Sequence, residues 1–409
     1  MPEKTLSSPI IADILGISKS NVPSWAVKNQ ITPSFTVGEI GHYPLSQLIL
    51  MKGFEFLVSD QWHRDERTAK PKKEFTSAEL FAGAGGLALG LERAGFKHVF
   101  LNEIDKSACQ TLRHNRPHWN IIEGDVSFQD FSQFQGEVDL LSGGFPCQAF
   151  SYAGKKMGFE DVRGTLFFEF ARAVRDIQPK VLLAENVKGL RAHDKGRTLK
   201  TIMNVISELG YFLVEPEILK AIFYRVPQKR ERLILVAVRK DIWKDGCFEF
   251  PSKFPQIFTL RDALKAGQLY NSDVSDADGQ KYPKRKSQIM KYVPQGGYWR
   301  DLPIKLQKEY MLKSFYLGGG KTGMARRLSW DEPSLTLTCA PAQKQTERCH
   351  PDETRPLNVR EYARIQTFPD DWEFQGSISQ IYKQIGNAVP VNLGYAVGRS
   401  IVKMLNQVT

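Results

Sequence analysis

The sequence lacks the features that mark membrane and secreted proteins. No run of uncharged apolar residues approaches the length of a membrane span. The first residues, MPEKTLSSPIIADILG, lack the basic-then-apolar order of a secretory signal. The five cysteines are widely spaced and form no C-x-x-C pair, which disfavours a disulfide framework and a structural zinc site. We therefore expect a soluble, cytoplasmic protein without a bound metal.

The composition excludes a disordered or fibrous chain. Hydrophobic residues make up 42% and charged residues 25% of the 409 residues, which are ordinary globular values. This length accommodates a large catalytic domain and one or two smaller modules. The net charge of +11 favours a polyanionic partner such as nucleic acid, although many basic enzymes act on small molecules.

Residues 1–70 predict a small helical module. Apolar residues of a first helix share one face, and Gly16 follows as a helix stop. Ser20 is a better cap for a second helix than Ser18, because it leaves Pro23 in the first turn. This is the outline of a helix-turn-helix that binds operator DNA. The alternative is a helical docking module without a DNA contact.

The rest of the chain divides by its pattern. The polar stretch 60–74 lacks apolar periodicity and predicts a linker. Residues 75–250 alternate apolar runs with helical segments, which predicts a catalytic domain of the doubly wound α/β class with a parallel sheet. We expect strands at residues 76–82, 98–102, 138–142, 181–184 and 233–238, and helices at 87–94, 165–177 and 198–209. Ligands are expected beyond the carboxyl ends of the strands.

Residues 251–352 are irregular, and helical patterning returns over 353–409. Between Lys281 and Arg300 lie six basic residues and no acidic one, interleaved with aromatic residues that include Trp299. Cations with aromatics are typical of phosphate contact and base stacking, so we expect a smaller nucleic-acid-contacting domain here. A solvated insertion is the alternative.

A glycine-rich turn ends the first expected strand. Gly83, Gly85 and Gly86 let the backbone approach a ligand at the start of a helix. Their spacing is not the dinucleotide pattern and no Walker lysine follows, so a nucleoside cofactor without phosphates is favoured. Glu103 ends the next strand, where a carboxylate can bind ribose hydroxyls, and Asp125 is placed for an adenine amino group.

Cys147 lies among turn residues, in GGFPCQ, directly after another expected strand. Turn residues present a thiol to a ligand, whereas the other four cysteines are interpreted as buried spectators. The following strand carries Glu185 to the same edge of the sheet. A nucleophile and a carboxylate are therefore expected to converge there.

These residues lie in blocks that resemble a known family. The blocks are ELFAGAGGLALGLERAGF, GGFPCQAFS, RGTLFFEFARAV, AENVKGL, VPQKRERLILVAV, RPLNVREYARIQTFPDDW and QIGNAVPVNLGYAVG. Their order and content resemble those of the bacterial cytosine-5 DNA methyltransferases of type II restriction-modification systems. The resemblance covers residues 76–238 and 355–400, and it includes a threonine-leucine signature at residues 333–338.

The resemblance implies an enzyme that transfers a methyl group from S-adenosylmethionine to carbon 5 of cytosine in double-stranded DNA, after flipping the base out. It implies a covalent thiolate at Cys147 and a carboxyl at Glu185 that meets the ring nitrogen. Arg232 would hold the base's carbonyl oxygen, while Arg230 and Arg163 would brace the catalytic loop and the DNA backbone. Gln228 belongs to the same Q-x-R-x-R pattern.

The same resemblance implies further cofactor contacts. Adenine would stack on Phe81, because Ile104 stands where many relatives have tryptophan. Leu166 and Asn387 are also expected at the cofactor. An RNA cytosine methyltransferase and an inactive DNA-binding homologue are the alternatives. Protection of host DNA beside a cognate restriction endonuclease is implied by the family.

Overall fold

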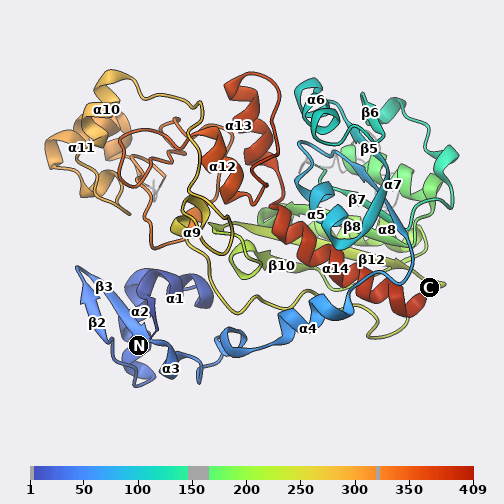
Figure 1. Ribbon diagram of the computed structural model, residues 1–409, viewed down its shortest axis with the longest axis horizontal. Coiled ribbons are helices and arrows are strands. Elements are labelled where there is room, and N and C mark those ends of the chain that lie inside the picture. The colour runs from blue at the N-terminus through green and yellow to red at the C-terminus, as the bar shows by residue number, and fades with distance from the viewer. Residues whose placement is uncertain (1–3, 146–164, 319–322) are drawn as a thin grey trace.

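The computed structural model describes residues 4–145, 165–318 and 323–409. A central sheet flanked by helices forms the largest part (Figure 1). A smaller lobe carries α10 (Lys284–Met290) and α11 (Ile304–Met311) (Figure 1). An N-terminal module of residues 4–58 lies on the other side of α9 (Leu260–Leu264), beside the sheet. Cys147 and Arg163, both predicted to be catalytic, lie outside the described residues.

Eight strands form the central sheet in the order β10-β12-β8-β7-β4-β5-β6, with β9 paired to β12. Their bounds are β4 (Phe75–Leu80), β5 (Phe96–Glu103), β6 (Ile121–Glu123), β7 (Leu140–Gly143), β8 (Val181–Val187), β9 (Tyr211–Leu213), β10 (Glu217–Lys220) and β12 (Glu231–Arg239). From β4 to β8 the pairing is parallel, as predicted. The prediction is wrong for β12, which runs antiparallel to β8 because the chain turns back after β10 and pairs with it.

Helices cover both faces of this sheet, close to their predicted positions. α5 (Gly86–Ala94) and α14 (Val391–Val408) bury apolar residues in one cluster, whereas α7 (Leu166–Ile177) and α8 (Arg197–Glu208) bury theirs in another. α6 (Lys106–Asn115) connects β5 to β6. The N-terminus of α7 is fixed by Thr165, whose side chain accepts a hydrogen bond from the Phe168 N–H.

The C-terminal residues return to the catalytic domain through two contacts. α12 (Val359–Ile365) and α13 (Ile378–Asn387) share an apolar cluster with α9 (Leu260–Leu264) and α5. α14 then crosses α5 at Gly90, where a β-carbon would lie 2.6 Å from Val391 O and from Tyr395 N. Glycine at this point lets the two helix backbones approach more closely than any side chain would allow.

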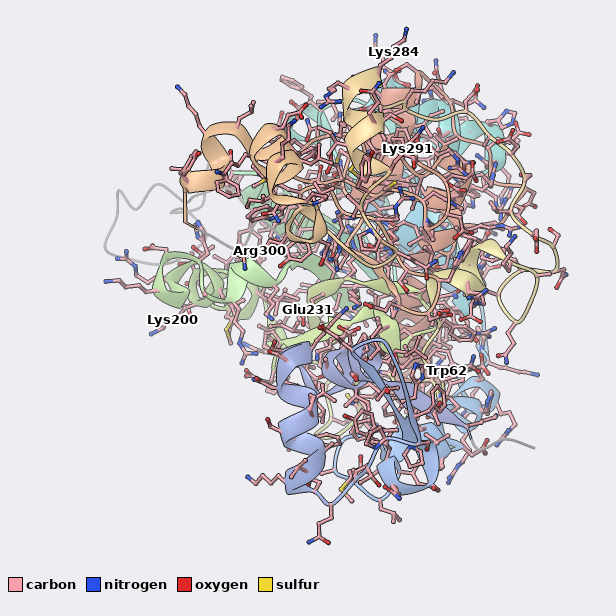
Figure 2. All side chains as sticks on the ribbon, turned by 90° about the vertical axis from the view of Figure 1, so that its left-hand side faces the viewer. Trp62, Lys200, Glu231, Lys284, Lys291 and Arg300 are labelled. Atoms are coloured by element: carbon pink, nitrogen blue, oxygen red, sulfur yellow. The ribbon has the colours of Figure 1, made fainter. Side chains whose placement is uncertain are left out.

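The smaller lobe has its own apolar core. α10 (Lys284–Met290) and α11 (Ile304–Met311) pack around Trp299, which is 6% exposed. Among the aromatic residues of the segment predicted to stack on bases, Trp299 is excluded because its ring is already covered by protein, whereas Tyr292 is 63% exposed. Lys284, Lys291 and Arg300 remain on the surface of this lobe (Figure 2). The pair β11 (Gln228–Lys229) and β13 (Ser334–Leu335) joins the segment that follows the lobe to the catalytic domain.

The N-terminal module contains the two predicted helices and a sheet that was not predicted. Its elements are β1 (Thr5–Ser7), α1 (Ser8–Leu15), α2 (Val22–Lys28), β2 (Phe35–Val37), β3 (Ile40–Pro44) and α3 (Leu45–Leu48). Gly16 ends α1 in the left-handed conformation, as expected. The predicted Ser20 cap is wrong, because Asn21 precedes α2 and no side chain caps it. The hairpin between β2 and β3 turns at Gly38, and V-G-E-I was its signal in the sequence.

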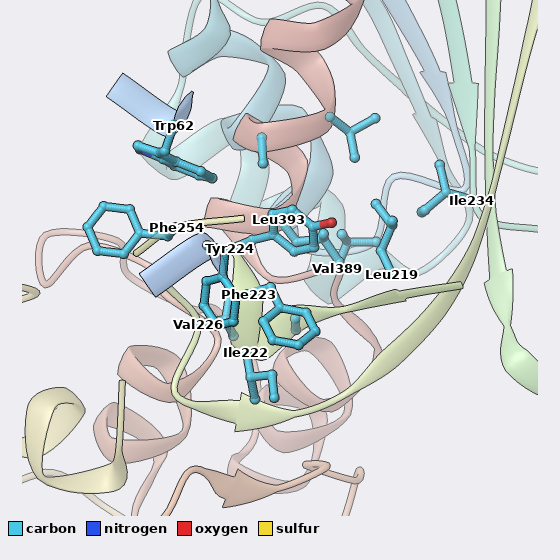
Figure 3. Packing of buried hydrophobic residues seen from close by; sticks show 14 of the residues in the cluster. Trp62, Leu219, Ile222, Phe223, Tyr224, Val226, Ile234, Phe254, Val389 and Leu393 are labelled. Carbon is cyan, nitrogen blue, oxygen red and sulfur yellow. The ribbon is translucent and has the colours of Figure 1, made fainter. Parts of the chain in front are cut away.

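The predicted linker at residues 60–74 is also wrong in part. Residues Gln61–Thr68 form α4, and its Trp62 is 1% exposed. The Trp62 ring meets Phe254 edge-on at 5.3 Å between centroids (Figure 3). The Arg399 guanidinium lies 3.7 Å from the centroid of the Trp62 ring. Burial of a single tryptophan therefore anchors a helix that has no apolar periodicity.

In the described ranges no helix is both long and apolar enough to cross a bilayer.

The close approach of α5 and α14 gives a test of the fold. Gly90→Ala should destabilise the protein by about 1–3 kcal/mol, because its β-carbon would meet the backbone of α14. This loss should exceed the gain in helix propensity from alanine. Gly267→Ala is the matched control, since a β-carbon there meets nothing within 4 Å. Denaturant melts measure both variants, and equal stability of the two would contradict this packing.

Candidate active site

A cavity of about 790 Å³ lies at the carboxyl ends of the parallel strands. Residues at the ends of β4 and β5 form one wall, and residues of β8 and β12 form another. Residues 336–339 and 383–389 close the third side. The position beyond the carboxyl ends is where open α/β sheets bind ligands, as the sequence predicted.

The glycine-rich turn shapes the first wall. Phe81 and Gly83 both line the cavity and have positive φ angles of 60° and 55°. A left-handed phenylalanine is strained, and such strain is commonly kept at ligand sites. At Gly86 a β-carbon would lie 2.2 Å from Val389 O, so glycine is required where the C-terminal segment crosses. Gly85 caps α5 and does not line the cavity.

Glu103 is held rigidly at the end of β5. Its Oε2 accepts from the Gly83 N–H at 2.7 Å, and its Oε1 accepts from the N–H groups of Ile104 and Asp105 at 2.9 and 2.8 Å. Ile104 lines the cavity with 65% of its surface exposed. A fixed carboxylate beside exposed apolar surface fits the ribose and adenine of a nucleoside cofactor.

Two expected cofactor residues do not line this cavity. The carboxylate of Asp125 accepts hydrogen bonds from the N–H and hydroxyl of Ser127, and Leu166 begins α7. Their cofactor roles remain predictions. Asn387 lines the cavity at the end of α13, far from the other motifs in sequence.

Glu79 is a cavity residue that the sequence analysis missed. It is 3% exposed, and its Oε2 has no hydrogen-bond partner among the described residues. Burial, followed by the charges of Glu103 and Glu185, raises the pKa of Glu79 well above its ordinary value of 4.5. A glutamate inside the apolar strand F-T-S-A-E-L was the signal for it.

Glu185 and Arg232 form an ion pair on the opposite wall. They come from β8 and β12, and each side chain is 13% exposed. A β-carbon at Gly144 would lie 3.3 Å from Glu185 Oε2, so a glycine there leaves room beside the carboxylate. Glu185 and Arg232, which the family resemblance assigned to the same cytosine, therefore meet in one cavity.

Asn186 ties β8 to the segment that leads toward Cys147. It is 4% exposed, and its Nδ2 donates to Phe145 O at 2.8 Å. Phe145 lines the cavity and is the last residue described before Cys147.

Arg230 and Gln228 bind other parts of the protein, although Arg230 also lines the cavity. Arg230 is 2% exposed and donates to Gly386 O at 3.1 Å. Burial and the charge of Arg232 lower its pKa to about 9. The predicted contact of Arg230 with the DNA backbone is wrong, because the guanidinium is enclosed by protein. Gln228 is fully buried, and its Oε1 accepts from the Leu337 N–H at 3.0 Å.

Residues 336–339 bring two further groups to the cavity. Thr336 lines it, and the exposed Cys339 donates from Sγ to Asn387 Oδ1 at 3.1 Å. The interpretation of Cys339 as a buried spectator is therefore wrong. Lys383 also lines the cavity and pairs with Asp105 at 2.9 Å. The described residues contain no group of three His, Cys, Asp or Glu that could bind a metal.

The buried Glu79 gives a pH-dependent test. Because its pKa is raised in the folded protein, the folded state keeps a proton that the unfolded chain releases above about pH 4.5. Stability should therefore fall as pH rises toward the folded pKa, by up to about 1.4 kcal/mol per pH unit. Glu79→Gln removes this loss, so its advantage in Tm over the wild type should grow from pH 5 to pH 8. Melting without cofactor measures it, with the exposed Glu39→Gln as control, and a pH-independent difference would contradict the assignment.

Comparisons with known proteins show the family to which this chain belongs. The family model for C-5 cytosine-specific DNA methylase matches residues 75–403. The type II methyltransferase M.Eco47II of Escherichia coli is 63% identical over 100% of this chain and 98% of its own length. M.PspPI of Psychrobacter sp. (strain TA137) is 60% identical over 99% of this chain and 97% of its own length.

Solved structures share the fold. A crystal structure described as a candidate DNA modification methyltransferase from an E. coli prophage matches with a TM-score of 0.63 and 24% identity. The match covers 81% of this chain and 100% of that one. With the family match and the two relatives, the chain belongs to the C-5 cytosine-specific DNA methylases, enzymes that use S-adenosylmethionine as methyl donor.

Proposed function

We propose that this enzyme methylates one cytosine within a short sequence of double-stranded DNA, by covalent thiolate addition to a flipped-out base. The observation that carries the proposal is the Glu185–Arg232 pair, which shares one cavity with Phe81, Glu103 and Asn387. The proposed base contacts and cofactor contacts therefore open onto the same space.

Cys147, Glu185 and Arg232 would each carry one part of the chemistry. Cys147 attacks carbon 6 of the cytosine as a thiolate, which makes carbon 5 nucleophilic. After carbon 5 has taken the methyl group, loss of its proton to a base or water breaks the carbon–sulfur bond and restores the ring and the free thiolate. Glu185 shares a proton with ring nitrogen N3, where negative charge develops, and Arg232 donates to the carbonyl oxygen. The ion pair between these two side chains supports this division, because each fixes the other before the base arrives.

Phe81, Glu103, Ile104 and Asn387 would hold S-adenosylmethionine, which when bound supplies an electrophilic methyl group. The backbone N–H groups that bind Glu103 would hold its carboxylate toward the ribose. The cavity would exclude water from the reacting carbon.

A cytosine within a duplex does not reach such a cavity, so the base has to be flipped out at an unstacking cost of a few kcal/mol. Lys284, Lys291 and Arg300 on the smaller lobe support contact with the DNA backbone (Figure 2). The relatives' name of type II methyltransferase supports a role in protecting host DNA from a cognate restriction endonuclease.

Operator binding by residues 1–70 stays a prediction. The two helices joined after Gly16 agree with a helix-turn-helix outline. The charge does not favour it, because residues 4–58 contain four lysines, three carboxylates and no arginine. DNA-binding modules of this kind rely on a cationic face. A gel shift on upstream DNA tests this prediction.

Replacement of the nucleophile tests the proposed function directly. Cys147→Ser should lower methyl transfer to duplex DNA by more than about 1,000-fold, because a hydroxyl is a far weaker nucleophile than a thiolate. Tritiated methyl incorporation measures the rate, and Cys247→Ser, remote from the cavity, is the matched control. Normal incorporation by Cys147→Ser would refute the mechanism. A covalent adduct with 5-fluorocytosine DNA would exclude an inactive homologue, and transfer to tRNA in place of DNA would favour an RNA enzyme.

Ile104 gives a test of the cofactor wall. Ile104→Trp should tighten the Kd for S-adenosylmethionine about 3- to 10-fold, because a stacked aromatic ring adds about 0.5–1.5 kcal/mol. The side chain is 65% exposed, so a larger one has room. Isothermal titration calorimetry measures the affinity. Ile104→Ala should weaken it, and two variants with the wild-type Kd would remove Ile104 from the adenine site.

A further inference from the structure

Alternating charges connect the N-terminal module to Lys229 of β11, which directly precedes Arg230 and lies three residues before Arg232 of β12. Lys229 Nζ lies 2.8 Å from Asp13 Oδ2 and 2.9 Å from Glu332 Oε2. Glu332 also accepts from Lys19 Nζ at 2.7 Å. The side chains of Lys229, Asp13 and Glu332 are 17%, 21% and 11% exposed, so these charges are largely removed from water. Three distant segments of the chain therefore meet at one lysine.

Lys229 lies between two residues that build the active-site wall. The Gln228 side chain accepts from the Leu337 N–H, and the Arg230 guanidinium donates to Gly386 O. Lys229 is directed oppositely, as alternation along an extended chain requires. Its backbone oxygen accepts from Thr336 Oγ1 at 2.5 Å, and Thr336 lines the cavity. The position of Lys229 thus affects both Arg230, which follows it, and the threonine-leucine segment at residues 333–338.

A second contact brings the module to the edge of the site. Lys220 Nζ donates to Asp13 O at 2.9 Å. The end of α1 also lines a separate cavity of about 460 Å³. The far wall of that cavity contains Arg230, Arg232 and Thr336, which line the active-site cavity too. The N-terminal module and the active-site cavity therefore lie on opposite sides of one wall, which contains Arg230, Arg232 and Thr336.

Apolar packing keeps the module in this position. Its Phe56 meets Phe223 of the catalytic domain edge-on at 5.3 Å, and Lys253 lies 4.3 Å from the Phe223 ring. Residues of the module and of the central sheet belong to one hydrophobic cluster. Phe223, Leu219 and Ile234 lie together in it (Figure 3). A module packed in this way can transmit the position of Asp13 to the sheet.

We propose that the N-terminal module is a positioning element of the methylation site, which acts through Asp13 and Lys19 on Lys229 and Glu332. The inference rests on the proposed function, since it gives the module a part in the same reaction. In this role Asp13 and Lys19 touch neither base nor cofactor. They hold β11, which leads directly into the strand of Arg232, and they hold the segment that presents Thr336.

The size of the effect follows from the geometry. Without the Asp13 charge, Lys229 is left with one carboxylate in a mostly buried place, and the strand relaxes toward solvent. A displacement of about 1 Å at a reacting group costs up to about 100-fold in rate. The cofactor wall, built on β4 and β5, does not depend on this network. Loss of kcat with normal cofactor binding is therefore the expected signature.

Asp13→Asn and Lys19→Met in the full-length enzyme test this inference. We expect kcat on cognate duplex DNA to fall about 10- to 100-fold for Asp13→Asn and less for Lys19→Met, whose side chain is 46% exposed. The Kd for S-adenosylmethionine should stay within about twofold. Asp13→Glu, which keeps the charge, should restore most of kcat. Glu39→Gln and Lys28→Met are matched controls, because both residues are exposed on the module outside the network.

Wild-type kcat in both network variants would overturn the inference, as would an equal loss in the controls. If Asp13→Asn fails to fold, Lys19→Met and Lys19→Arg test the inference. A fall in kcat for Lys19→Met that Lys19→Arg reverses would support it, and wild-type kcat in Lys19→Met would overturn it. Failure of the proposed function would be visible separately, as an absence of duplex methylation by the wild-type enzyme or as activity in Cys147→Ser.

Discussion

The ion pair between Glu185 and Arg232 is the contact on which the geometry of the site depends. Glu185 lies near the carboxyl end of β8, and Arg232 is the second residue of β12. Residues at opposite ends of two strands meet only if the strands are antiparallel, and β12 is the strand that reverses direction in the sheet. A parallel β12 would put the arginine at the amino edge, the full length of a strand away from the carboxylate. The departure from a parallel sheet is therefore what completes the site.

Burial of Arg230 has a related consequence. An enclosed guanidinium is costly unless its N–H groups have partners, and here Leu337 and Gly386 supply carbonyl oxygens to the two terminal nitrogens, while Nε has no partner among the described residues. These two hydrogen bonds tie Arg230 to the end of α13 and to the threonine-leucine segment. These segments are more than 100 residues from Arg230 in sequence. The arginine predicted to contact DNA instead fixes the walls between which the ligands bind.

The sequence patterns predicted the positions of the strands and helices, but they did not predict the direction in which every strand pairs. The parallel strands and the helices α5, α7 and α8 follow from apolar periodicity, and Glu103 and Glu185 follow from their positions at strand ends. The direction of β12 did not follow, because strand composition carries no information on the partner. Trp62, Trp299 and Cys339 were misjudged for a similar reason. Exposure depends on which distant segment covers a residue, and local sequence does not encode that cover.

The smaller lobe is held to the catalytic domain at its two ends. The lobe leaves the catalytic domain after α9 and returns through β13, which pairs with β11 immediately beside Arg230. Closing a longer loop costs little additional entropy, so the lobe is free to differ in length and sequence. Its two ends are not free, because α9 packs with α12 and Glu332 pairs with Lys229. Where the lobe joins the domain, the same few side chains hold the lobe and the wall of the active-site cavity.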